Sequence, residues 1–215
     1  MKKKNHLLPS VAILSQPLLP LLLFTFYFLL PSPSASAQVA LHAGYSPEQW
    51  ATPETAINFH SYNAGVDFRV PIVGRLGVLL GVQGRWSTES DSKRFEVDTN
   101  HRTNIVAAEI PLLLNYNFRI TDDFRITPFA GAKFSYYIKG RTRDANGHPI
   151  NEWFDEENEA RRMNRLNISS TFGLALSYSH FHLFGGYNIG LSDMDNVEST
   201  LTLVGGPFLG LAVGF

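Results

Sequence analysis

Hydrophobic and polar residues alternate strictly along two neighbouring stretches in the middle of the chain. In residues 110–120 the apolar side chains fall on even positions, and the same alternation runs through residues 124–138. A period of two places alternate side chains on opposite faces of a β-strand, whereas a helix repeats its apolar residues every three or four positions. The pattern therefore predicts a hairpin of two antiparallel strands, each longer than the roughly five or six residues usual in soluble sheets.

The same period recurs along the rest of the chain and predicts eight strands. They cover residues 39–45, 62–72, 76–87, 104–120, 124–138, 166–179, 181–191 and 201–215. Long polar connections follow the first, third, fifth and seventh strands, at residues 46–58, 87–103, 139–165 and 192–199, whereas the other connections are short. Short turns at one end and long loops at the other are typical of an up-and-down outer-membrane barrel.

Aromatic residues on the apolar face gather near both ends of the predicted strands. Those near the long-loop end are Tyr45, Tyr62, Trp86, Tyr136 and Tyr187, and those near the short-turn end are Phe68, Phe118, Phe124, Tyr178, Phe181 and Phe215. Two such belts with aliphatic residues between them match the aromatic girdles at the two membrane interfaces. We therefore predict an all-β fold, an eight-stranded antiparallel up-and-down transmembrane β-barrel in the outer membrane.

The first residues predict a cleaved signal peptide over residues 1–37, followed by the barrel domain over residues 38–215. Three lysines precede a Leu- and Phe-rich run, and Ala35-Ser36-Ala37 supplies the small residues that a signal peptidase requires. An uncleaved anchor is the alternative, but prolines interrupt the run below the roughly 20 residues of a spanning helix.

The composition narrows the possible partners and cofactors. Removing residues 1–37 leaves 15 Lys and Arg against 19 Asp and Glu, which gives no basic excess for nucleic acid. Zero cysteines exclude disulfides and thiolate metal sites. His180 and His182 stand two positions apart across a turn and are expected to diverge, so we predict no metal, cofactor or catalytic residues.

Three charged residues are predicted to meet inside the barrel. Arg85, Glu109 and Lys133 fall on the polar face at similar heights, and Glu109 is expected to be the only acid on the interior face of the outer half. An eight-stranded barrel is just wide enough for side chains, so this face should form a polar plug. Replacing Glu109 by Gln should leave buried positive charge uncompensated, and replacing Arg85 as well should restore part of the loss.

The chain resembles the PorT-like outer-membrane β-barrel family of Gram-negative bacteria. The similar segments are residues 41–45, 109–113, 128–131 and 187–193, together with the terminal Phe215. The resemblance implies an eight-stranded barrel in the outer membrane and supplies no catalytic residues. One branch of that family is associated with a secretion and gliding apparatus.

The expected function is that of a structural or interaction protein, an accessory of a secretion, adhesion or envelope complex, and not of an enzyme. The candidate contact residues for a protein partner, or for cations bridging lipopolysaccharide, are Trp153, Phe154, Asp155, Glu156 and Glu157 in the longest loop. The alternative for this loop is a solvated segment without a partner. The alternative functions are a narrow porin-like channel and, more distantly, a lipid-active enzyme. Outer-membrane lipid and the barrel-assembly machinery are further expected partners, the latter reading Phe215 as an assembly signal.

Overall fold

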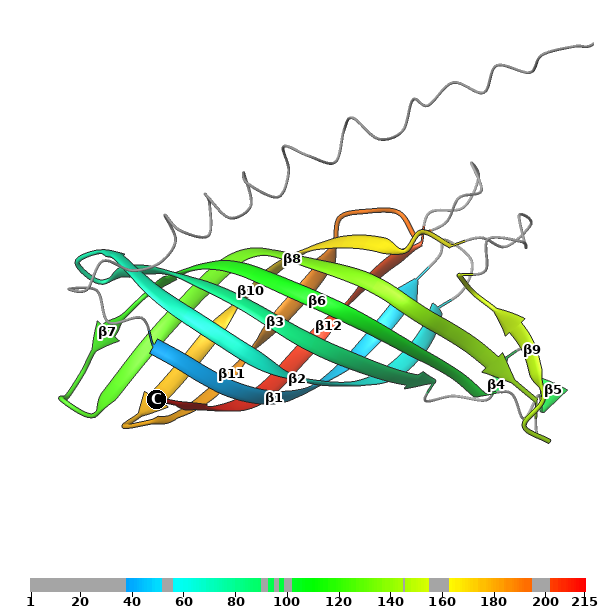
Figure 1. Cartoon of the computed structure of the whole chain (residues 1–215), viewed down its shortest axis with the longest axis horizontal. Helices are drawn as coiled ribbons and strands as arrows, with labels where there is room; N and C mark the ends of the chain where they lie inside the picture. The colour runs from blue at the N-terminus through cyan, green and yellow to red at the C-terminus, as the bar shows by residue number, and fades with distance from the viewer. Residues whose placement is uncertain are drawn as a thin grey trace, which may run out of the picture. The chain divides into compact units, whose positions relative to one another are not determined.

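Each long strand pairs with the long strand before it and the long strand after it, and the last pairs with the first. The structure is a computed structural model that describes residues 38–51, 56–89, 93–94, 97–98, 102–144, 146–154, 163–194 and 202–215. The barrel strands are β1 (Gln38–Ala51), β2 (Ala56–Val73), β3 (Leu76–Glu89), β6 (Arg102–Tyr116), β8 (Phe124–Arg143), β10 (Leu166–Tyr178), β11 (Phe181–Gly190) and β12 (Leu203–Gly214). Antiparallel pairing of β1 with β12, from Ala40 opposite Gly214 to Ala51 opposite Leu203, closes the barrel (Figure 1). The predicted eight-stranded antiparallel barrel is confirmed.

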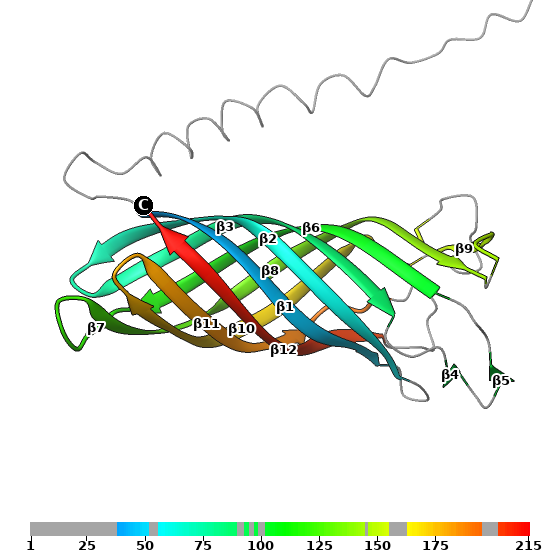
Figure 2. The ribbon, with the colours of Figure 1, turned by 90° about the horizontal axis from the view of Figure 1, so that it is seen from below.

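Four short strands accompany the barrel. They are β4 (Lys93–Arg94) and β5 (Val97–Asp98), which pair with each other, β7 (Phe118–Arg119), which pairs with the start of β8, and β9 (Pro149–Glu152), which pairs with its end. Figure 2 shows the long strands crossing the barrel at a slant, with the C-terminus at the end that carries the short turns. No helix within the described segments is long and apolar enough to span a membrane. The predicted signal peptide, residues 1–37, lies outside the described residues.

The two faces of the strands reverse the usual arrangement of a soluble protein. Large apolar side chains such as Leu41, Leu114 and Leu211 are more than half exposed on the outside, whereas polar side chains such as Ser61 and Glu109 are fully buried inside. An apolar exterior suits lipid and a polar interior suits the narrow bore of a small membrane barrel.

The predicted long loops are partly strand, and the predicted boundaries are wrong there. β1 continues to Ala51 and pairs with β2 from Ala56 onward, while β8 continues to Arg143. Polar composition favoured loops at these positions, but the ladder continues because the inward side chains find interior partners. Ser46, Glu48 and Trp50 keep the even-numbered inward phase of β1 and are buried.

Candidate functional site

The structure brings the three predicted interior charges together. Arg85, Glu109 and Lys133 come from the adjacent strands β3, β6 and β8, whose register places Glu109 opposite Gln83 on one side and Ser135 on the other. Glu109 Oε1 lies 3.3 Å from Arg85 Nε and 3.4 Å from Lys133 Nζ. One buried carboxylate thus faces two cations.

A second acid, Glu48, completes this cluster. Its two carboxylate oxygens each accept a hydrogen bond of 2.5 Å from Arg85 Nη1, and both side chains are buried. The expectation that Glu109 is the only acid on the interior face of the outer half is therefore wrong. Sequence reasoning placed Glu48 in a loop, although the even-numbered phase of Ala40 and His42 continues through it.

Polar contacts continue from Glu109 across the bore. Ser135 Oγ donates to Glu109 Oε1 at 2.8 Å, and Gln83 Nε2 donates to Glu109 Oε2. Gln83 Oε1 lies 2.8 Å from His42 Nε2, and His42 Nδ1 lies 3.0 Å from Asp67 Oδ2. We call Glu48, Arg85, Glu109, Lys133, Gln83, His42 and Asp67 the interior network. Such a network is favourable only when its members satisfy one another, because unpaired buried charges are costly.

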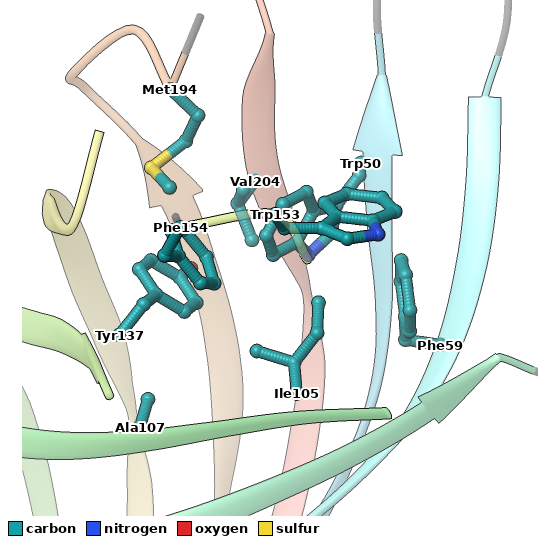
Figure 3. Packing of buried hydrophobic residues seen from close by; sticks show 9 residues of the cluster. All are labelled: Trp50, Phe59, Ile105, Ala107, Tyr137, Trp153, Phe154, Met194 and Val204. Atoms are coloured by element: carbon teal, nitrogen blue, oxygen red, sulfur yellow. The ribbon is translucent and has the colours of Figure 1, made fainter. Parts of the chain in front are cut away.

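Aromatic side chains fill the bore on the long-loop side of the interior network. We call this cluster the aromatic plug; it contains Trp50, Phe59, Ile105, Ala107, Tyr137, Trp153, Phe154, Met194 and Val204 (Figure 3). The ring centroids of Trp50 and Trp153 lie 5.5 Å apart, and those of Tyr137 and Phe154 lie 5.3 Å apart. The Arg85 guanidinium lies 5.2 Å from the centroid of the Tyr137 ring, which joins the plug to the network.

The two aromatic residues predicted to contact a partner are instead part of this plug. Trp153 is 8% exposed and Phe154 is 4% exposed, so neither presents a surface to a partner, and the prediction is wrong for both. The chain after β9 folds back into the bore, where Trp153 N donates to Gly140 O at 3.0 Å and Trp153 Nε1 donates to Thr142 Oγ1 at 2.8 Å.

A glycine makes room for this inserted segment. A Cβ atom on Gly140 would lie 2.7 Å from the Phe154 ring, closer than side-chain contacts allow. The other predicted contact residues of the loop, Asp155, Glu156 and Glu157, lie outside the described residues.

A cavity of about 90 Å³ lies on the other side of the network, toward the short turns. Its walls include network residues such as His42 and Lys133, and it reaches Asn115 and Thr127 near the short-turn ends of β6 and β8. Three phenylalanines, Phe129, Phe184 and Phe208, line it as well. No group of three or more His, Cys, Asp or Glu side chains in the described ranges has an arrangement that could hold a metal ion.

The C-terminal Phe215 lies at the outer surface of the short-turn end. Its side chain is 74% exposed, and its backbone N–H donates to Val39 O at 2.8 Å. Its role as an assembly signal stays a prediction.

Comparisons with known proteins place this geometry in a family. A family model described as an outer membrane protein beta-barrel domain matches residues 34–196. No curated protein sequence matches the chain.

Several solved structures are similar at low sequence identity. Neisserial surface protein A is 14% identical, with 85% of this chain and 99% of that chain covered and a TM-score of 0.48. The attachment invasion locus protein Ail of Yersinia pestis is 14% identical, with 83% and 99% covered and a TM-score of 0.44. The outer membrane enzyme PagL is 10% identical, with 79% and 98% covered and a TM-score of 0.44.

These comparisons correct the expectation about enzyme activity and bear on the expected family and location of the chain. The expectation that the chain is not an enzyme is wrong as a conclusion from its barrel, because an outer membrane enzyme is among the similar structures. The narrower PorT-like assignment is not confirmed. The family model covers most of the chain and confirms the predicted location in the outer membrane. This chain belongs to the outer membrane protein beta-barrel domain family.

Proposed function

We propose that this protein is a structural or interaction barrel whose bore is closed to solutes. The observation that carries the proposal is the direct contact between the interior network and the aromatic plug. Tyr137 and Glu109 have no exposed surface, and Phe59 and Trp50 are 1% and 2% exposed. An ion entering from the long-loop end would have to displace these rings and then break buried charge pairs.

The proposed contact surface for a protein partner is the long-loop end. Trp153 and Phe154 are directed inward, so the contacts are assigned to outward residues of the same connection. Ile150 is 52% exposed and His148 is exposed beside it, in the segment before the inserted rings. An accessory role in a secretion, adhesion or envelope complex fits a rigid barrel that presents such loops.

Recording from planar bilayers tests the closed bore. Purified full-length protein should give no steady single-channel steps, and a Trp153→Ala/Phe154→Ala variant should give a measurable rise in conductance. A Leu209→Ala/Leu211→Ala variant, altered only on the lipid side, serves as the matched control and should stay silent. Steady steps from the unaltered protein would favour the narrow porin-like channel instead.

A crosslinking experiment tests the proposed contact surface separately. A photo-crosslinking residue at position 150, in intact cells, should capture a discrete protein that the same residue at position 72 does not capture. Ile72 is similarly exposed, 57% against 52%, but lies at the short-turn end. Equal capture at both positions would count against a partner at the long loops.

A further inference from the structure

The outer ends of β6 and β8 carry basic residues on the outward face of the barrel. Arg102 is the direct register partner of Arg143, Asn104 is that of Arg141, and Val106 is that of Lys139. The residues between them face the bore, since Thr103 Oγ1 lies 3.0 Å from Thr142 Oγ1 and Thr103 is buried. Alternation therefore directs these four cations away from the bore. We call Arg102, Lys139, Arg141 and Arg143 the basic rim.

A β-bulge creates this arrangement. The register of β6 and β8 shifts between Val106 and Ala107, so Ile138 is an extra residue on β8 and both Ile138 and Lys139 are exposed. Beyond the bulge the odd-numbered residues of β8 face outward in place of the even-numbered ones. Arg165 supports the bulge, because its Nη1 donates to the carbonyl oxygen of Ile138 at 3.1 Å. Bulges commonly re-aim side chains in this way.

Among the residues that the structure describes, a single acid pairs with the basic rim. Glu152 on β9 pairs with Arg141, but Arg102, Lys139 and Arg143 form no ion pair with any residue that the structure describes. Asp144 is engaged elsewhere, because it accepts hydrogen bonds from the backbone of Asn146 and His148. Like charges directly opposite each other destabilise a strand pair. The Arg102 and Arg143 pair is thus an arrangement that a bound anion would stabilise.

The rim begins just beyond the aromatic belt. Tyr136 is 50% exposed on the outward face of β8, three residues before Lys139. Belt aromatics sit at the membrane interface. Three residues of strand span about 10 Å, or about 8 Å along the membrane normal at the usual tilt of about 40°. Lys139 is therefore at headgroup depth, with Arg102 and Arg143 farther from the lipid core.

We propose that the basic rim binds the phosphate groups of an anionic lipid in the outer leaflet. The guanidinium groups of Arg102 and Arg143 present forked donors that match phosphate oxygens, and Lys139 adds a point charge nearer the lipid core. The inference rests on the outer-membrane location of the barrel and is independent of the closed bore. Bound lipid would fix the height of the barrel and order the β8–β9 end, which carries the inserted rings.

Lipid retention tests the proposal directly. Full-length protein is reconstituted in nanodiscs of phosphatidylcholine with a minor fraction of lipid A, released, and analysed by native mass spectrometry. An Arg102→Gln/Arg143→Gln variant should bind lipid A with an affinity reduced on the order of tenfold. The reason is that each basic residue near an anionic surface raises the binding affinity severalfold. Arg75→Gln/Arg119→Gln removes two exposed cations at the short-turn end and should retain lipid A like the parent. Equal retention by all three proteins would overturn the proposal.

Further measurements identify the source of the phosphate. Lipid A without its phosphates should be retained no better than phosphatidylcholine, and millimolar inorganic phosphate should not compete. Displacement by inorganic phosphate, or preference for a soluble sulfated polysaccharide, would refute a lipid site. Arg102→Lys/Arg143→Lys should recover most of the retention, and the heat-modifiable gel shift of each variant verifies that it is folded.

Discussion

The outer and inner halves of the barrel interior are built from the same alternating strands but are filled differently. In the outer half, rings from β1, β2, β8 and the inserted segment after β9 pack against one another above a paired charge cluster. In the inner half, three phenylalanines and several polar side chains surround a cavity of about 90 Å³. An even polar pattern along the strands therefore does not imply even packing along the bore.

The difference arises from the source of the filling side chains. In the inner half the described side chains that line the cavity all come from strands. Glycines leave room for the rings there, since a Cβ on Gly210 would lie 2.3 Å from the Phe184 ring and one on Gly173 would lie 2.6 Å from the Phe129 ring. In the outer half the chain after β9 returns into the bore and adds Trp153 and Phe154. A returning segment can close a bore that strands alone leave partly open.

The largest expected effect comes from the buried carboxylate that joins the two halves. Glu109→Gln should destabilise the barrel by about 3–5 kcal/mol, because Lys133 then remains buried without a counter-charge. Urea unfolding in detergent and the temperature of the heat-modifiable gel shift both measure the loss.

The rescue partner distinguishes the contacts within the cluster. Lys133→Met should restore part of the stability lost in Glu109→Gln, whereas Arg85→Met should not, because removing Arg85 would leave Glu48 unpaired. This reverses the sequence-based expectation that Arg85 is the rescue site. Better rescue by Arg85→Met would contradict the pairing of Glu48 with Arg85.

The next largest effect is expected from removing a ring of the inserted segment. Trp153→Ala should cost about 3 kcal/mol in the free energy of unfolding, because a buried ring is lost from a packed cluster. The same truncation is compared in the two halves by Phe154→Ala, at a buried ring of the plug, and Phe208→Ala, at a half-buried ring that borders the cavity and should cost less. Equal losses, measured by urea unfolding, would mean that the two halves are packed alike.

A smaller effect compares overpacking in the two halves. Ala107→Leu adds atoms inside the aromatic plug and should cost about 1–3 kcal/mol. Ala175→Leu adds the same atoms beside the cavity, where Ala175 lies in the wall, and should cost under about 1 kcal/mol. Thermal unfolding of the two variants ranks them, and a larger loss for Ala175→Leu would argue against the cavity.

The smallest effect concerns the turn that leads into the inserted segment. The carboxylate of Asp144 accepts hydrogen bonds from the backbone N–H groups of His148 and Asn146. These bonds, with the His148 bond contributing more, hold the pKa of that carboxyl below its ordinary value. A depressed folded-state pKa means that the turn is favoured above the ordinary Asp pKa, and that this contribution is lost as pH falls through the folded-state pKa.

Nuclear magnetic resonance can follow this turn. The amide resonance of His148 should move at a pH below the ordinary Asp value of about 3.9, and Asp144→Asn should abolish that movement. A transition centred at the ordinary Asp pKa would show that the turn does not stabilise the charged carboxylate.

The sequence alone determined the number of barrel strands, their two faces, and the grouping of Arg85, Glu109 and Lys133. These features follow from the two-residue period, which fixes the direction of each side chain once the chain is extended. A barrel with one register per hairpin then carries these residues to neighbouring positions on β3, β6 and β8.

Only the tertiary structure decided that Glu48 belongs to the charge cluster, that Trp153 and Phe154 point inward, and that a bulge at Ile138 turns Lys139 outward. Polar composition at residues 46–58 and 139–165 resembles that of loops, and local pattern carries no signal for a segment that folds back into a bore. Several of the contacts that hold these residues join strands far apart in the chain, as between Trp50 and Trp153, so their energies exist only once the tertiary structure has formed.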